Sequence, residues 1–235
     1  LDAGLDVAEL RQLLGPLDVP MIDFLMPIES ADPETRKRIE VECERMARLA
    51  HSINCPAIQV VALNEFPGSD WTSQKAILVS RLRELSAIAN PYGVRLAIEG
   101  AIFSPFRQIS QALEVIDEVG ADRVGLCLDT WHLWLGGTSW EEVAALDPAL
   151  ILSVQLADTA ARSGPDWQDE DRTALPGEGV LPLGEAIDAV LATGYSGFWT
   201  YEMLSARHWE WDPEDFATAM LERMRVLMTG RIQAQ

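Results

Sequence analysis

The chain has 235 residues, of which 18 are Lys or Arg and 37 are Asp or Glu, so its formal net charge is −19. This excess of negative charge argues against binding to a nucleic-acid backbone or an anionic membrane, because both are bound through Lys and Arg. The hydrophobic fraction of 48% can fill a core, which excludes a disordered chain. No run approaches the roughly 20 apolar residues that span a membrane.

Three cysteines, Cys43, Cys55 and Cys127, lie in apolar surroundings and show no CxxC spacing. An odd, sparse set of this kind is typical of buried thiols in a reducing compartment and is unsuited to disulfides or a zinc site. We therefore expect a cytoplasmic protein with no nucleic-acid or membrane partner.

Short apolar runs rich in β-branched residues alternate with longer segments of helical periodicity, and several runs lack polar alternation, as strands buried on both faces do. The predicted strands are Met21–Met26, Ala57–Leu63, Arg95–Glu99, Val124–Asp129, Ile151–Leu156 and Phe198–Glu202. The predicted helices are Pro33–Ile53, Trp71–Ala89, Pro105–Val119, a short helix opened by the capping box at 139–142, Leu183–Leu191, and a helix from Asp212-Pro213 to about Met228.

Strand starts lie 27 to 47 residues apart, which is one strand plus one helix per interval and indicates a parallel sheet in a single domain, residues 1–235. A doubly wound sheet would carry a Gly-rich phosphate turn after its first strand, and none is present. We expect an α/β fold, a (β/α)8 TIM barrel, with the first two strands absent from this chain. The edges left open should then be covered by an upstream segment or by another chain.

The longest interval contains residues 158–180, which show no helical or strand periodicity. A loop of this length in a compact domain is usually a lid or a binding loop.

Polar side chains stand at the ends of four predicted strands. They are Glu99, Asp129, Gln155 and Glu202, with Asp158 just after the third. The carboxyl ends of parallel strands meet at one mouth, and no Lys or Arg close in sequence compensates these acids, so the pattern favours a metal ion. A single acid at a strand end can instead cap the following helix.

His132 follows Asp129 in the motif DTWH and is expected over the same mouth. Trp residues cluster at 131–140 and 209–211. Such segments are typical either of a sugar pocket or of a subunit contact, which leaves a homo-oligomer open.

Five motifs carry a resemblance to a known superfamily: LAIEG at 96–100, GLCLDTWHLW at 125–134, VQLADT at 154–159, RTALPGEGVLPL at 172–183 and GYSGFWTYEM at 194–203. In these motifs the chain resembles the xylose-isomerase-like TIM barrels, which include sugar isomerases, epimerases and related dehydratases. The resemblance covers roughly the last 60% of the chain. Residues before 90 match the superfamily only in the alternation of strands and helices.

The resemblance implies metal ligation by Glu99, Asp129, Gln155 and Glu202. Most epimerases of the family have His where this chain has Gln155. The resulting all-oxygen ligand set suits Mn²⁺ or Mg²⁺ better than zinc. A similar amide occurs in the dehydroshikimate dehydratase branch.

The resemblance further implies that Glu99 and Glu202 act in proton transfer, that His132 and Arg172 contact substrate oxygens, and that Trp131 lines the substrate pocket. The expected function is a metal-dependent isomerase or epimerase of a keto-sugar or cyclitol, acting through an enediolate. Two alternatives stay open: a dehydratase of the 3-dehydroshikimate or inosose type, and a catalytically silent binding or partner subunit.

Overall fold

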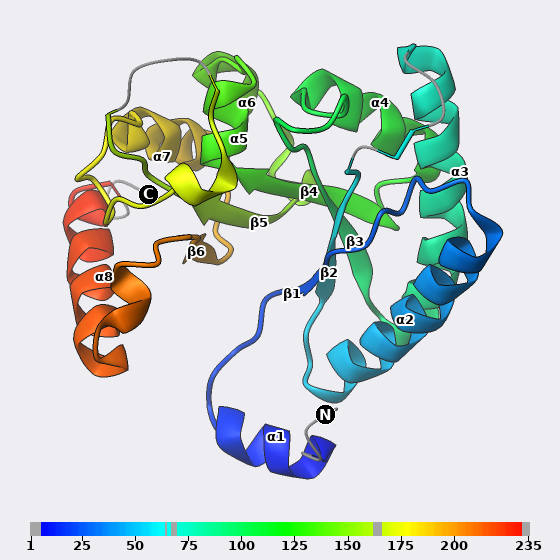
Figure 1. Ribbon diagram of the computed structural model, residues 1–235, viewed down its shortest axis with the longest axis horizontal. Coiled ribbons are helices and arrows are strands. Elements are labelled where there is room, and N and C mark those ends of the chain that lie inside the picture. The colour runs from blue at the N-terminus through cyan, green and yellow to red at the C-terminus, as the bar shows by residue number, and fades with distance from the viewer. Residues whose placement is uncertain (1–5, 64, 67–69, 162–165, 232–235) are drawn as a thin grey trace. The chain divides into compact units, whose positions relative to one another are not determined.

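The computed structural model describes residues 6–63, 65–66, 70–161 and 166–231, and Figure 1 shows its helices and strands. The chain forms two compact units, Leu1–Cys127 and Leu128–Gln235. The boundary falls inside strand β4 (Val124–Asp129), so this strand begins in one unit and ends in the other.

The first unit pairs β1 (Ile22–Phe24), β2 (Ala57–Val61), β3 (Arg95–Glu99) and the start of β4 in parallel. One row of the register runs through Ile22, Ile58, Leu96 and Val124. The helices of this unit are α1 (Val7–Leu14), α2 (Pro33–Ser52), α3 (Trp71–Ala89) with the short η1 (Asn90–Tyr92), and α4 (Ile109–Val119).

The second unit pairs β5 (Ile151–Leu156) with β6 (Trp199–Tyr201), also in parallel. Its helices are α5 (Thr130–Leu135), α6 (Trp140–Ala144), α7 (Leu183–Ala192) and α8 (Pro213–Met228), with short 3-10 turns η2 (Pro148–Leu150), η3 (Asp169–Asp171) and η4 (His208–Glu210).

The order of the strands, β1-β2-β3-β4-β5-β6, is the order of the chain. A doubly wound sheet reverses its strand order at a switch point, whereas a barrel adds each strand beside the previous one. The prediction of six parallel strands with a barrel order is therefore confirmed. The bounds predicted for β3, β4 and β5 agree with the structure, while β1, β2 and β6 are shorter than predicted.

Side-chain caps fix the starts of several helices. Asp32, Asp70, Ser139 and Asp212 each accept a backbone N–H from the first turn, as the predicted capping box and Asp-Pro pair require. The predicted start at Pro105 was wrong, because the backbone N–H of Ala101 bonds the carbonyl of Phe106 and closes a turn there. Helix α4 begins only at Ile109.

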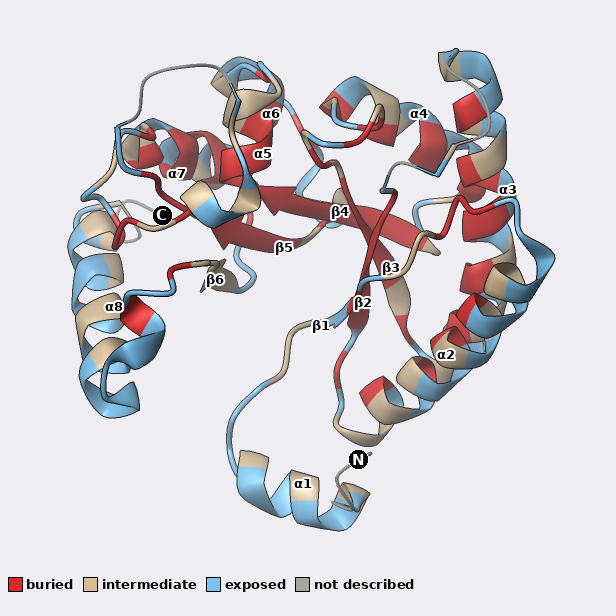
Figure 2. Cartoon of the chain, viewed as in Figure 1, coloured by how far each residue is buried: buried red, intermediate tan, exposed pale blue. Residues whose placement is uncertain are grey.

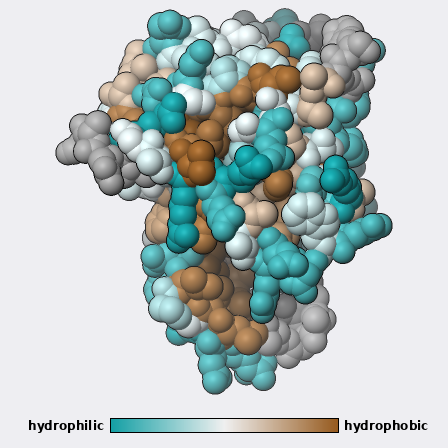
Figure 3. All heavy atoms as spheres, turned by 90° about the vertical axis from the view of Figure 1, so that its left-hand side faces the viewer, coloured by the Kyte–Doolittle hydropathy of each residue, from teal (hydrophilic) through white to brown (hydrophobic). Residues whose placement is uncertain are grey.

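Figure 2 shows that the buried residues concentrate on the strands and on the inner faces of the helices. Every residue of β2 and of β4 is buried. The three cysteines are free and buried, as predicted. On the face shown in Figure 3, hydrophobic patches lie among hydrophilic side chains. Within the described residues, no helix combines the length and apolar character that crossing a membrane requires.

The core of the first unit generates a stability prediction. Leu96 of β3 is fully buried, so Leu96→Ala should lower the free energy of unfolding by roughly 2–5 kcal/mol. Leu13→Ala is the matched control, because Leu13 on α1 is 72% exposed and its loss should cost at most about 1 kcal/mol. Urea denaturation measures both. Equal losses would show that Leu96 does not contribute to the core as its burial indicates.

Candidate functional site

Asp129 ends β4 and at the same time begins α5. Its Oδ1 accepts hydrogen bonds from the backbone N–H groups of Trp131 at 2.8 Å and His132 at 3.0 Å. The capping alternative raised by the sequence is thus confirmed for this acid. The cap uses one carboxylate oxygen and leaves Oδ2 for another partner.

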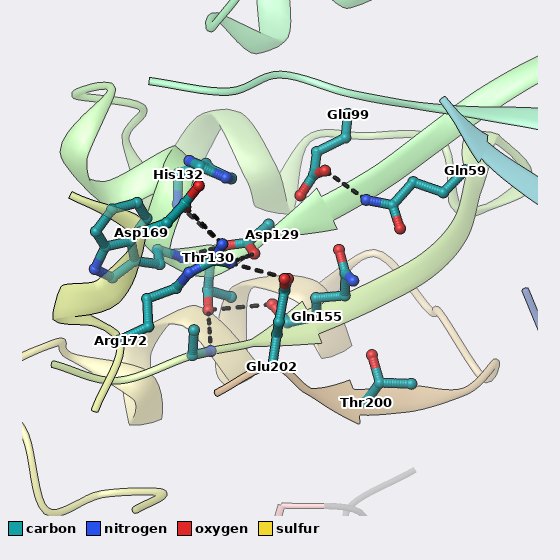
Figure 4. A network of polar contacts seen from close by, with 12 residues as sticks. Gln59, Glu99, Asp129, Thr130, His132, Gln155, Asp169, Arg172, Thr200 and Glu202 are labelled. Atoms are coloured by element: carbon teal, nitrogen blue, oxygen red, sulfur yellow. Dashed lines mark hydrogen bonds and ion pairs between the residues drawn. The ribbon is translucent and has the colours of Figure 1, made fainter. Parts of the chain in front are cut away.

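That partner is Arg172, which is buried. Its Nη1 lies 3.0 Å from Oδ2 of Asp129 and 2.9 Å from Oε2 of Glu202, and its Nη2 lies 2.6 Å from Oδ1 of Asp169 (Figure 4). The guanidinium carbon stands 5.1 Å from the ring centroid of Trp131, close enough for a cation–π contact. One guanidinium therefore links three carboxylates from three segments of the second unit.

No Lys or Arg lies close to these acids in sequence, but the fold brings one to them. Arg172, 43 residues from Asp129, pairs with both Asp129 and Glu202. The fold supplies the partner, because the segment after η3 returns to the carboxyl end of β4.

Burial shapes the protonation of these acids. Burial raises the pKa of Asp129, and the positive charge of Arg172 and the two backbone N–H groups oppose the rise. Burial, followed by the negative charge of Asp129, raises the pKa of Glu202 to about 7, while Arg172 opposes the shift. Glu202 can therefore both take up and release a proton near neutral pH.

His132 lies in the first turn of α5 and is buried. Burial, and then the charge of Arg172, lower the pKa of its imidazole to about 4. Its ring meets that of Trp131 edge-on, with 5.1 Å between centroids. At neutral pH the uncharged imidazole offers one N–H donor and one lone pair.

Gln155 lies in β5 and is buried. The hydroxyl of Thr130 donates to its backbone carbonyl at 3.2 Å and accepts from the N–H of Ala157 at 3.3 Å, which ties the start of α5 to β5. Gln155 also pairs in register with Thr200 of β6, two residues before Glu202. The fold thus places Asp129, His132, Gln155, Arg172 and Glu202 in one part of the second unit.

Glu99 belongs to the first unit, where it ends β3 and is 5% exposed. Its Oε2 accepts a hydrogen bond at 2.5 Å from Nε2 of Gln59, a residue in the middle of the buried strand β2. The amide fixes the direction of the carboxylate.

Asp158, which follows Gln155 in the motif VQLADT, organises the loop at 176–181. Its Oδ2 accepts from the N–H groups of Gly177 and Gly179, and its Oδ1 accepts from those of Thr159 and Leu181, at 2.8–3.1 Å. A Cβ built on Gly179 would lie 2.1 Å from Asp158 Oδ1, so only glycine fits there. Both oxygens of Asp158 are committed to this loop.

The described residues of the predicted lid, 158–161 and 166–180, are tied to the body of the second unit. The hydroxyl of Tyr201 donates to the carbonyl of Ala174 at 2.8 Å, and the N–H of Leu204 bonds the carbonyl of Arg172 at 2.9 Å. Residues 162–165 of the predicted lid lie outside the described residues.

Two neighbours of the predicted site residues were missed. Gln59 gave a usable signal, since it is the only polar residue in a five-residue apolar strand. Asp169 gave none, because it stands among other acids in the run DED and only tertiary structure selects it as the partner of Arg172. Of the Trp residues, Trp131 contacts Arg172 as described above, whereas Trp209 is 67% exposed.

The model of the xylose isomerase-like TIM barrel family matches residues 2–227. The chain belongs to this family. The resemblance predicted from its motifs is confirmed.

Two curated relatives are inosose isomerases. The chain is 29% identical over 196 residues to that of Halalkalibacterium halodurans, covering 83% of this chain and 69% of the relative. It is 32% identical over 143 residues to that of Bacillus licheniformis, covering 60% of this chain and 51% of the relative. A crystal structure of the IOLI protein with a bound zinc atom superimposes with a TM-score of 0.88 at 23% identity, covering 97% of this chain and 83% of that one.

The Asp158 network generates a prediction. Asp158→Asn places an amide NH2 against two backbone N–H donors whichever way it turns, so the free energy of unfolding should fall by about 2 kcal/mol. Asp166→Asn is the control, because Asp166 lies exposed between β5 and η3, and its change should stay within about 0.5 kcal/mol. Thermal unfolding measures both variants. A stable Asp158→Asn variant would contradict the role of the carboxylate in holding the loop.

Proposed function

We propose that the protein is a metal-dependent isomerase or epimerase of a keto-sugar or cyclitol. One observation carries the proposal: carboxylate oxygens of Asp129 and Glu202 converge on a single cationic nitrogen at 3.0 and 2.9 Å. The inosose isomerases among the relatives support a cyclitol ketone as the substrate class. The free, buried cysteines support a cytoplasmic location.

We further propose that Glu99, Asp129, Gln155 and Glu202 hold a divalent cation. The second unit fits this role, since Asp129 and Glu202 already turn their oxygens toward one positive charge. Glu99 ends β3 and Asp129 ends β4. Gln155 is the last residue but one of β5, and Glu202 directly follows β6. Oxygen donors of this kind favour Mn²⁺ or Mg²⁺. The bound zinc of the IOLI structure supports a metal in this fold.

When bound, the cation would polarise the substrate carbonyl and stabilise the negative charge that develops as the neighbouring C–H loses its proton. Glu202 takes up this proton as the general base. Glu99, fixed by Gln59, is the second proton-transfer group. Neutral His132 and the guanidinium of Arg172 hydrogen-bond substrate oxygens.

The reaction branches after the first proton transfer. Return of the proton to the opposite face of the same carbon gives an epimer, and its return to the neighbouring carbon gives an aldose–ketose isomer. The alternative is dehydration, in which a β-hydroxyl leaves instead. Gln155 specifically favours this second candidate, because a similar amide occurs at this position in the dehydroshikimate dehydratase branch of the superfamily.

Proton transfer to a keto-cyclitol can be measured directly. With Mn²⁺ and an inosose in D₂O, the wild-type protein should incorporate deuterium beside the carbonyl, and a chelator should abolish the uptake. Glu202→Gln should slow the uptake by at least about 10²-fold, because an amide cannot exchange the proton. Glu222→Gln, an exposed change on α8, is the control and should leave the rate unchanged.

The products then separate the candidates. Exchange with a new isomer or epimer supports the proposal, and an enone or diketone product supports the dehydratase. No exchange with a panel of inososes, keto-sugars and 3-dehydroshikimate would contradict catalysis and favour a silent binding subunit.

The role of Gln155 generates a separate prediction. Gln155→His replaces an oxygen donor with the softer imidazole, so the relative affinity for Zn²⁺ or Co²⁺ over Mn²⁺ should rise by about tenfold or more. Competitive metal titration of both proteins measures the ratio. An unchanged ratio would show that Gln155 does not contact the metal.

A further inference from the structure

Arg172 has two kinds of partner in the second unit. Its Nη1 contacts Asp129 and Glu202, two of the acids proposed to bind metal, while its Nη2 contacts Asp169 at 2.6 Å. The two metal-site acids are buried or half-buried, at 0% and 32% side-chain exposure, whereas the Asp169 side chain is 41% exposed. The guanidinium therefore bridges the interior of the site and its rim (Figure 4).

A guanidinium and a divalent cation compete for the same oxygens. A cation bound to Oδ2 of Asp129 and Oε2 of Glu202 would repel the charge on Nη1 and remove its hydrogen-bond acceptors. Arg172 is 4% exposed and carries a permanent charge, so losing every carboxylate partner there would be costly. Metal binding thus requires another acceptor for this guanidinium.

We propose that Asp169 is this acceptor, and thus a positioning residue that retains Arg172 when a cation takes over Asp129 and Glu202. The inference rests on the proposed metal site and adds a residue to it. Asp169 lies in η3, three positions before Arg172. Its carboxylate already accepts a hydrogen bond from Nη2 of Arg172, so retaining the guanidinium requires no movement of the backbone. The cation–π contact with the ring of Trp131 also holds the guanidinium in place.

The proposal distinguishes Asp169 from its neighbours in the run DED. Glu170 is exposed on the same turn, and Asp171 accepts the backbone N–H of Gln168 at 2.8 Å instead. Glu170→Gln removes the same charge one residue away and therefore controls for the general attraction between an acidic loop and a cation.

The first experiment measures Mn²⁺ affinity of the full chain by isothermal titration calorimetry. Asp169→Asn should weaken Mn²⁺ binding by about tenfold or more, because Arg172 then has no carboxylate to retain it. Glu170→Gln should change the affinity by no more than about threefold, and Asp169→Glu should restore most of the loss. Thermal unfolding of each variant verifies that the fold is intact.

A double-mutant cycle tests whether Asp169 acts through Arg172. Arg172→Gln removes the competing charge and should tighten Mn²⁺ binding. In that background Asp169→Asn should have no more effect than Glu170→Gln. Activity is not needed for this readout.

The outcomes are distinct. An equal loss from Asp169→Asn with and without Arg172 would show that Asp169 acts on the metal directly, which overturns the positioning role. If Asp169→Asn binds Mn²⁺ with the same affinity as the wild-type protein, the positioning role is also overturned, while the proposed metal site stands. If the wild-type protein binds no Mn²⁺, the proposed metal site fails and this inference fails with it.

Discussion

The contact on which the site depends is the pairing of one Arg172 nitrogen with carboxylate oxygens of Asp129 and Glu202. Two buried or half-buried acids at strand ends would repel each other, and a positive charge between them makes their approach tolerable. The same contact sets the chemistry, because the balance between burial, Asp129 and Arg172 brings the pKa of Glu202 to about 7. The residue that compensates charge thus also tunes the acid that we propose moves the proton.

The loop that carries Arg172 is held by a different acid. Asp158 gathers four backbone N–H groups around its carboxylate and so fixes the turn at 176–181, while Tyr201 and Leu204 bond the segment at 172–174. These bonds connect the loop to the end of β6, directly beside Glu202. The arginine can therefore reach the strand ends with a defined geometry, although the segment around it has little regular secondary structure.

Membership in the xylose isomerase-like TIM barrel family agrees with the motifs but leaves the reaction to the details of the site. Here those details are an amide in β5, a neutral buried histidine and a titratable glutamate. Together they support the proposed binding of a metal through oxygen donors and the proposed proton transfer beside a carbonyl. They differ from a zinc site dominated by imidazoles in the hardness of the donors.

The sequence by itself determined the strand rhythm, the helix caps and the acids at the strand ends, because hydrophobic periodicity and capping are local properties of the chain. Its motifs also identified the family. It could not show that Asp129 divides its two oxygens between a helix cap and an ion pair, that Asp158 serves the loop, or that Asp169 rather than Glu170 meets Arg172. Those choices join residues up to 43 positions apart in irregular segments, so only tertiary packing decides them.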